Sequence, residues 1–155
     1  AEPLRSFARA TSLVIAWIAL TMLAGGFVAG LDAGFTYNTF PLMDGQWIPT
    51  GAFARLTAPF DDIATVQFNH RVMAVSAVVL VSGLWVWARG ILRDRGVMPV
   101  FHALAAVVIL QAALGITTLV LVVPTPLGAA HQALAFVLLG LAVWARHSLQ
   151  SNVSD

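Results

Sequence analysis

Residues 11–31 read TSLVIAWIALTMLAGGFVAGL and contain no charged side chain. Away from the two ends of this stretch, the polar residue is Thr21. A helix of about 20 mostly apolar residues is long enough to cross the roughly 30 Å hydrocarbon core of a bilayer. The stretch therefore predicts a transmembrane helix, and this decides the class of fold.

Three further stretches have the same character, at residues 66–88, 97–123 and 126–146. The chain has 155 residues, of which 59% are hydrophobic and 10% charged, and its mean hydropathy is +0.87. A soluble domain carries about 25% charged residues, and a membrane β-barrel would show alternation at period two. We therefore predict an all-α polytopic membrane protein. Residues 1–155 are expected to form a single four-transmembrane-helix bundle in the lipid bilayer.

The basic residues predict the orientation of this bundle, because cytoplasmic loops carry an excess of Arg and Lys. All eight basic residues are Arg: six lie on one side of the predicted spans (Arg5, Arg9, Arg89, Arg93, Arg95 and Arg146) and two on the other (Arg55 and Arg71). Both termini are therefore expected in the cytoplasm, with the outer loop at residues 32–65. The lack of Lys favours a GC-rich bacterial genome, so we expect a bacterial inner membrane rather than a mitochondrial one.

Composition excludes several other functions. A net charge of +1 without a clustered basic face argues against nucleic-acid binding. A chain without Cys has no disulfide, thiolate metal site or thiol nucleophile. The sequon at Asn152 falls on the predicted cytoplasmic tail, where it predicts no glycosylation. The chain begins at Ala1 without a cleavable signal pattern, so we expect it to be a piece of a longer protein.

The outer segment, residues 32–65, is unusually long for a connection and rich in aromatic and turn residues. Two interpretations stay open for it. Its aromatic residues form a belt at headgroup level, or the segment folds as a lid over the mouth of the bundle. Asp32 at its start is either a functional acid or part of the turn that ends the first helix.

Two histidines lie at one depth near the outer ends of their spans. His70 is about four residues into the second span and His131 about five residues past Pro126. Both spans run inward from the same surface, so the two rings can face each other. A buried ionisable side chain in a span is costly and usually has a partner. Paired imidazoles from facing helices are a known haem ligation, whereas zinc requires further ligands. A haem site is therefore favoured over two interfacial histidines.

The neighbouring polar residues each allow two interpretations. Arg71 either pairs with a haem propionate or reaches lipid phosphate. Gln67 and Gln132 either orient an imidazole or satisfy backbone groups at the helix start. For Gln111, in mid-span, interhelical hydrogen bonding is preferred to chemistry. For the ladder of Gly26, Gly30 and Gly34, close helix approach is preferred to a flat surface for a porphyrin.

Several motifs resemble those of the haem A synthase family when taken in order. Residues 29–44 (AGLDAGFTYNTFPLMD) are similar to the family's outer-loop signature. Residues 66–71 (VQFNHR) resemble the first histidine motif of its C-terminal half. The second motif is matched by LGITTL at 114–119, VPTPL at 123–127 and AHQ at 130–132. The resemblance covers about a hundred residues.

The resemblance implies an eight-helix enzyme of two similar halves, an oxidoreductase that converts a ring methyl of haem O to the formyl group of haem A for cytochrome oxidase assembly. His70 and His131 would be axial ligands of a cofactor, haem b, in the C-terminal half. The substrate haem O would bind in the N-terminal half, beside an essential Glu outside this sequence. An oligomer or a contact with haem O synthase would be among the partners. This chain by itself is expected to bind haem without turning over substrate.

Two positions depart from the family pattern. The family usually has Asp before the first histidine, where this chain has Asn69, which puts an acid role there in doubt. The usual Phe-Glu-Asn reads Phe60-Asp-Asp. Two other functions stay open: a bis-His membrane b-type cytochrome acting only in electron transfer, and a haem-free transporter or assembly scaffold. The transporter is disfavoured because no Pro breaks a span at mid-membrane.

Overall fold

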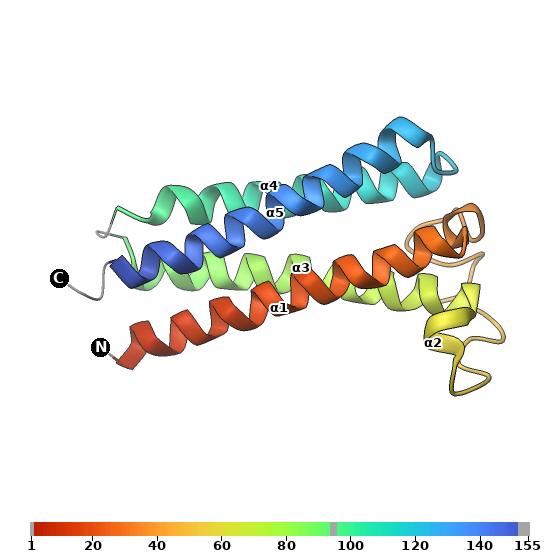
Figure 1. Ribbon diagram of the computed structural model, residues 1–155, viewed down its shortest axis with the longest axis horizontal. Helices are drawn as coiled ribbons and strands as arrows, with labels where there is room; N and C mark the ends of the chain where they lie inside the picture. The colour runs from red at the N-terminus through yellow and green to blue at the C-terminus, as the bar shows by residue number, and fades with distance from the viewer. Residues whose placement is uncertain (1, 94–95, 152–155) are drawn as a thin grey trace.

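The computed structural model describes residues 2–93 and 96–151 (Figure 1). Arg95 and the sequon at Asn152 lie outside these residues. The elements are α1 Glu2–Gly30, the short 3-10 helix η1 Ala33–Phe35, α2 Ala58–Asp61, α3 Ile63–Ile91, α4 Met98–Val120 and α5 Thr125–Ser151. Four of these helices, α1, α3, α4 and α5, are long and apolar enough to cross a membrane. The prediction of an all-α fold with four membrane-spanning helices is confirmed.

The helices are longer than the apolar stretches at several ends. Helix α1 begins at Glu2 rather than near residue 11, and α5 continues to Ser151 rather than ending near 146. Helix α3 begins at Ile63, inside the predicted outer loop, because Asp62 caps it by accepting a hydrogen bond from the Thr65 N–H at 2.8 Å. Hydropathy marks the part of a helix that lies in hydrocarbon, whereas capping groups mark where the helix begins.

The four long helices form two antiparallel pairs that lie side by side (Figure 1). Helix α1 packs mainly on α3, and α4 mainly on α5. The pairs join through contacts of α3 with α4 and of α1 with α5. At one end of the bundle the pairs are close together, and towards the other end they diverge (Figure 1).

The hydrophobic core fills only the end where α1 begins and α5 ends. Its buried residues are Phe7, Val14, Ile18, Val81, Leu84, Ala88, Leu92, Val97, Val100, Phe101, Leu104, Val108, Leu138, Ala142, Ala145 and Leu149. On α1 the core stops at Ile18, and on α5 it reaches no nearer the helix start than Leu138. The half of the bundle next to the outer segment therefore has no comparable apolar cluster between the helix pairs, within the described residues.

The outer segment is fixed to the ends of the helices. Asn38 donates hydrogen bonds from Nδ2 to the Gly34 carbonyl at 2.7 Å and to the Leu119 carbonyl at 2.9 Å, at the end of α4. Gly34 lies so close to Val123, in the α4–α5 link, that an added Cβ would fall 2.8 Å from its Cγ2 atom. Residues 33–38 therefore join α1 to the opposite helix pair at this end of the bundle.

Candidate functional site

His70 lies against α1 in the half of the bundle that the core does not fill. Its Nδ1 atom is 3.2 Å from the Thr21 carbonyl oxygen, which can only accept a hydrogen bond. This contact therefore favours the tautomer with the proton on Nδ1 and a free lone pair on Nε2. The ring packs on Gly25, where an added Cβ would be 3.0 Å from the His70 Cε1 atom.

His131 has the corresponding position between α5 and α4. Its ring packs on Gly115, where an added Cβ would be 2.6 Å from Cε1 and 3.2 Å from Nδ1. The Nδ1 atom of His131 is buried without a hydrogen bond among the described residues. The Gln111 side chain donates from Nε2 to the His131 carbonyl oxygen at 3.0 Å. The preferred interpretation of Gln111, interhelical hydrogen bonding, is confirmed.

The two histidines occupy equivalent positions in two similar helical hairpins, one formed by α1 and α3 and the other by α4 and α5. Gly25 lies five residues before the end of α1, and Gly115 lies five residues before the end of α4. In each hairpin a residue four places before the glycine contacts the histidine: the Thr21 carbonyl lies against the His70 ring, and the Gln111 side chain bonds the His131 carbonyl. The sequence reasoning missed both glycines. A shared sequence signal was available, because each preceding span has a polar residue four places before the glycine, Thr21 before Gly25 and Gln111 before Gly115.

The two rings also lie at matching depth. His70 is seven residues after Ile63, and His131 is six residues after Thr125. At 1.5 Å rise per residue, these offsets correspond to about 10 Å and about 9 Å from the helix starts.

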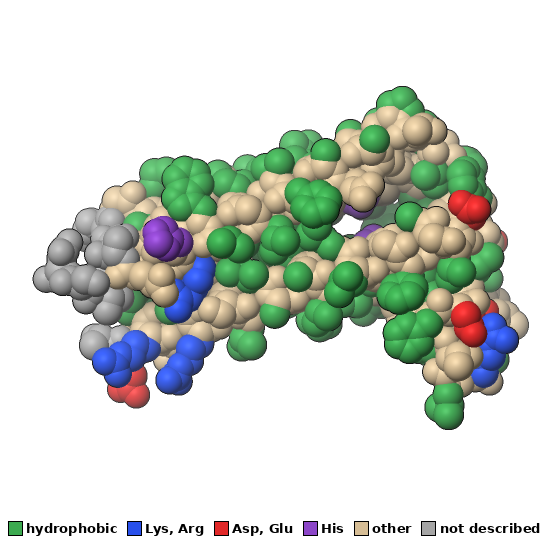
Figure 2. All heavy atoms as spheres, in the orientation of Figure 1, with side chains coloured by type: hydrophobic (Ala, Val, Ile, Leu, Met, Phe, Trp, Pro, Cys, Tyr) green, Lys and Arg blue, Asp and Glu red, His purple; other side chains and the backbone are tan. Residues whose placement is uncertain are grey.

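A space-filling view shows an opening between the two helix pairs, with histidine atoms on both of its rims (Figure 2). His70 and His131 are the histidines in this half of the bundle, whereas His102 and His147 lie towards the other end. The opening occurs where the hydrophobic core is absent. In the described part of the chain, no group of three or more His, Asp or Glu side chains could hold a metal ion.

Arg71 is occupied by the outer segment. Its guanidinium donates hydrogen bonds to the carbonyl oxygens of Tyr37, Thr39 (2.8 Å) and Leu42 (3.4 Å), and to Gln67 Oε1 (2.9 Å). Both terminal nitrogens are thereby engaged within the protein, and neither reaches outward as the lipid interpretation expected. The Nε atom of Arg71 is buried without a partner in the described structure.

Gln67 completes this arrangement, which we call the loop clamp (Gln67 and Arg71 with the main chain of residues 33–42). Gln67 Nε2 donates to the Ala33 carbonyl at 2.7 Å and to the Thr36 carbonyl at 2.5 Å. Gln67 therefore bonds main-chain groups of the loop, and not those of the helix start as the prediction had it. The aromatic residues Phe35, Trp47 and Phe60 remain exposed, as a headgroup-level belt requires.

The glycine ladder and Asp32 lie at and just beyond the end of α1. An added Cβ at Gly26 or Gly30 would meet nothing within 4 Å, so close helix approach in this chain does not explain those two glycines. Close approach does hold for Gly34, which packs on Val123, whereas the packed face of α1 passes through Gly25 rather than through Gly26 and Gly30. Asp32 has a φ of 53°, and its carbonyl oxygen accepts from the Phe35 N–H. This geometry favours the turn interpretation of Asp32.

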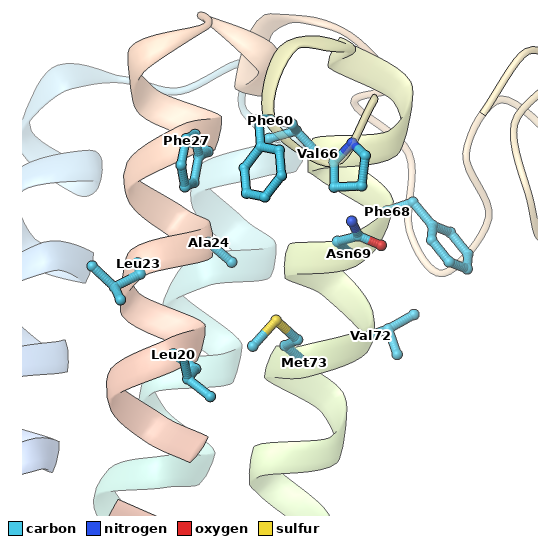
Figure 3. A pocket seen from close by; sticks show the side chains of 11 residues that line it. Leu20, Leu23, Ala24, Phe27, Phe60, Val66, Phe68, Asn69, Val72 and Met73 are labelled. Carbon is cyan, nitrogen blue, oxygen red and sulfur yellow. The ribbon is translucent and has the colours of Figure 1, made fainter. Parts of the chain in front are cut away.

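Asn69 points away from this site. It lines an apolar groove of about 400 Å³ between α1, α2 and α3, together with Leu20, Leu23, Ala24, Phe27, Pro59, Phe60, Val66, Phe68, Val72 and Met73 (Figure 3). Phe27 and Phe60 meet edge to face across the groove, with ring centroids 5.6 Å apart. The side chain of Asn69 is the polar member of this lining.

Comparison with known proteins places the chain in a family. Residues 2–143 match the COX15-CtaA family, described as cytochrome oxidase assembly protein. The chain belongs to this family. It is 44% identical over 144 residues to a haem A synthase of Granulibacter bethesdensis and 45% identical over 144 residues to that of Paramagnetospirillum magneticum. It is 41% identical over 150 residues to the haem A synthase COX15 of Bos taurus. Relatives are thus found in bacteria and in a mammal.

These alignments cover most of this chain but a minor part of each relative. They include 92% of the chain and 37% of the Granulibacter protein, and 95% of the chain and 36% of the bovine protein. The chain therefore spans about two fifths or less of the length of these three COX15-CtaA relatives. No solved structure matches it.

Proposed function

We propose that this chain is the C-terminal, haem b-binding half of a haem A synthase, with His70 and His131 as axial ligands of the iron. One observation carries the proposal: two imidazoles at matching depth pack on glycines of two equivalent hairpins, beside the opening between the hairpins. Bundles build cofactor sites from side chains on facing helices in this way. The alternative of a haem-free transporter gives no reason for the two glycine contacts.

The residues fit a haem. The contact of His70 Nδ1 with the Thr21 carbonyl leaves Nε2 free to bind a metal. Gly25 and Gly115 leave room for the rings where any larger residue would displace them. A haem held by both histidines would supply electron transfer rather than oxygen chemistry. Oxidation of haem O therefore belongs to the other half of the enzyme, and this chain alone binds haem without turnover.

The loop clamp has a positioning role in this proposal. It fixes residues 33–42 across the ends of α3 and α4, next to the histidine pair. Such a cover excludes water from the outer side of the site and supports the lid interpretation of the segment. The unpartnered Nε atom of Arg71 is the one donor of this guanidinium left for a propionate.

The proposal also includes a location and partners. The Arg distribution supports both termini in the cytoplasm and the haem site near the outer surface, and the lack of Lys favours a bacterial inner membrane. The partners would be haem O, bound through the N-terminal half, and an oligomer or haem O synthase contact. Asn69 lies in the apolar groove rather than at the histidines, so replacement of the family's usual Asp need not alter haem ligation.

Absorption spectroscopy of the purified chain, supplied with haem, tests the ligands. We expect a low-spin bis-imidazole spectrum that is lost in His70→Ala and in His131→Ala. His147→Ala is the matched control, because His147 is exposed and lies on the same helix as His131 near its other end. A colourless protein, or a low-spin spectrum that persists in both ligand variants, would contradict the proposal.

A second experiment separates a synthase half from a simple b-type cytochrome. The chain is combined with the N-terminal half of a haem A synthase and given haem O, a reductant and oxygen. Formation of haem A that depends on His70 and His131 supports the synthase. A bis-His spectrum without any haem A would leave only the electron-transfer function.

A further inference from the structure

A basic hollow lies at the end of the bundle where α1 begins and α5 ends, far from the histidine pair. It has a volume of about 540 Å³ and is lined by Arg5, Ala8, Arg9, Ser12, Leu13 and Arg146. Arg side chains gather at this end of the molecule (Figure 2). The hollow is formed between α1 and α5, which bring three guanidinium groups together.

The three guanidinium groups are available to a ligand. Arg5 and Arg9 are one helical turn apart on one face of α1, and both are exposed. Arg146 on α5 donates from Nε to Ser12 Oγ at 3.0 Å, which orients its guanidinium. Among the described residues, the salt bridge that is present joins Arg55 to Asp61, at the opposite end of the bundle. Glu2, on the first turn of α1, forms no ion pair with them.

The hollow changes from charged to apolar along α1. Arg5 and Arg9 line one part, Ser12 follows, and Leu13 is exposed at the edge. From Arg5 to Leu13 the helix rises about 12 Å, close to the distance over which a lipid passes from headgroup to acyl chain. Arg binds phosphate oxygens through paired N–H groups, and an exposed Leu suits hydrocarbon. The gradient therefore matches an amphiphile better than a soluble anion.

We propose that this hollow binds the headgroup phosphate of an anionic phospholipid, with the acyl chains passing over Leu13. Basic pockets between transmembrane helices are a known way of holding acidic lipids. The site requires a membrane-spanning bundle but does not depend on haem binding. With the predicted orientation, the lipid belongs to the cytoplasmic leaflet.

Native mass spectrometry of the full polypeptide released from nanodiscs tests the site. The nanodiscs contain phosphatidylcholine with increasing phosphatidylglycerol, and the fraction of protein carrying phosphatidylglycerol is measured. A hydrogen bond between charged groups contributes about tenfold in affinity, so Arg5→Gln with Arg9→Gln should weaken phosphatidylglycerol binding by about a hundredfold. The matched control is Arg89→Gln with Arg93→Gln, which removes two charges from the same side outside the hollow. Helicity by circular dichroism checks that both variants fold.

The outcomes separate three accounts. Loss of lipid in the Arg5 and Arg9 variant alone supports the site, and Arg146→Gln should then weaken binding as well. Equal loss in both variants means general surface attraction and overturns the proposal. If free glycerol phosphate, at the same concentration as phosphatidylglycerol, displaces the lipid, the hollow is a site for soluble anions. This outcome also overturns the proposal. Absence of bound phosphatidylglycerol on the full polypeptide means that another part of the protein covers the hollow, and this also overturns it.

Discussion

His131 on α5 packs directly on Gly115 of α4, so that a Cβ at position 115 would lie 2.6 Å from the imidazole Cε1 atom. Such a separation forces either the ring or the helix to move. Gly115→Ala is therefore expected to weaken haem binding by about 10- to 100-fold, the usual effect of displacing a group that supports a metal ligand. Gly25→Ala should also weaken haem binding, but by less, because its added Cβ would lie 3.0 Å from the His70 ring.

Gly26→Ala is the matched control for these variants, because nothing lies within 4 Å of its added Cβ. Alanine in an exposed helix stabilises it by about 1 kcal/mol relative to glycine. Haem titration followed by absorption spectroscopy measures all three variants. Unchanged affinity and an unchanged low-spin spectrum in Gly115→Ala would show that His131 does not hold the iron in the position proposed.

The loop clamp makes a prediction about Arg71. Arg71→Ala removes the donors to the Tyr37, Thr39 and Leu42 carbonyls, and Arg71→Lys keeps the charge without the forked geometry. We expect both to lower the opening free energy of residues 37–42 by about 2 kcal/mol, the size of one hydrogen bond to a charged group. Hydrogen–deuterium exchange with mass spectrometry measures this directly.

The control for the clamp is Arg55→Ala, which breaks an exposed ion pair with Asp61 at 3.2 Å in the same outer segment. Exposed pairs contribute about 0–1 kcal/mol, so exchange in residues 37–42 should stay unchanged. If Arg71→Ala leaves exchange there as slow as in the parent chain, the segment is held by Asn38 and Gln67 without Arg71.

Asp62 predicts a pH dependence of stability at the start of α3. The Thr65 hydroxyl and the Thr65 N–H both donate to the Asp62 carboxylate, and these hydrogen bonds lower the pKa of Asp62 below its ordinary value. A carboxylate with a lowered folded-state pKa stabilises the fold above its unfolded pKa, and this contribution is lost as pH falls through the folded pKa. Stability should therefore decrease below about pH 4.

Thermal unfolding in detergent between about pH 3 and pH 6 tests this. Asp62→Asn should remove part of the decrease, because the amide caps the helix without titrating. The neighbouring Asp61→Asn serves as control, since Asp61 is exposed and pairs only with exposed Arg55. Identical pH profiles for the parent chain and Asp62→Asn would contradict the assignment.

Orientation can be measured because the chain has no Cys. Leu56 is 99% exposed in the outer segment, and Gly90 near the end of α3 has open space around an added Cβ. In intact cells, a membrane-impermeant maleimide should label Leu56→Cys but should label Gly90→Cys only after permeabilisation. The reverse pattern would place the haem site at the cytoplasmic surface.

The sequence by itself determined the four membrane-spanning helices, because partition into hydrocarbon depends on the apolar residues of one continuous stretch. It also indicated that His70 and His131 lie at similar depth, because helical rise is uniform. Asp62 is a residue type that commonly caps helices, but hydropathy alone placed the start of this helix later, near residue 66.

Only the tertiary structure decided which residues meet. Gly25 rather than Gly26 or Gly30 contacts His70, because the rotation of α1 about its axis is set by packing against α3 and not by glycine spacing. Arg71 binds loop carbonyls rather than lipid, because residues 33–42 return across α3 and offer acceptors that no local pattern reveals. The basic hollow likewise depends on α5 bringing Arg146 beside Arg5 and Arg9, which are more than 130 residues away in the chain.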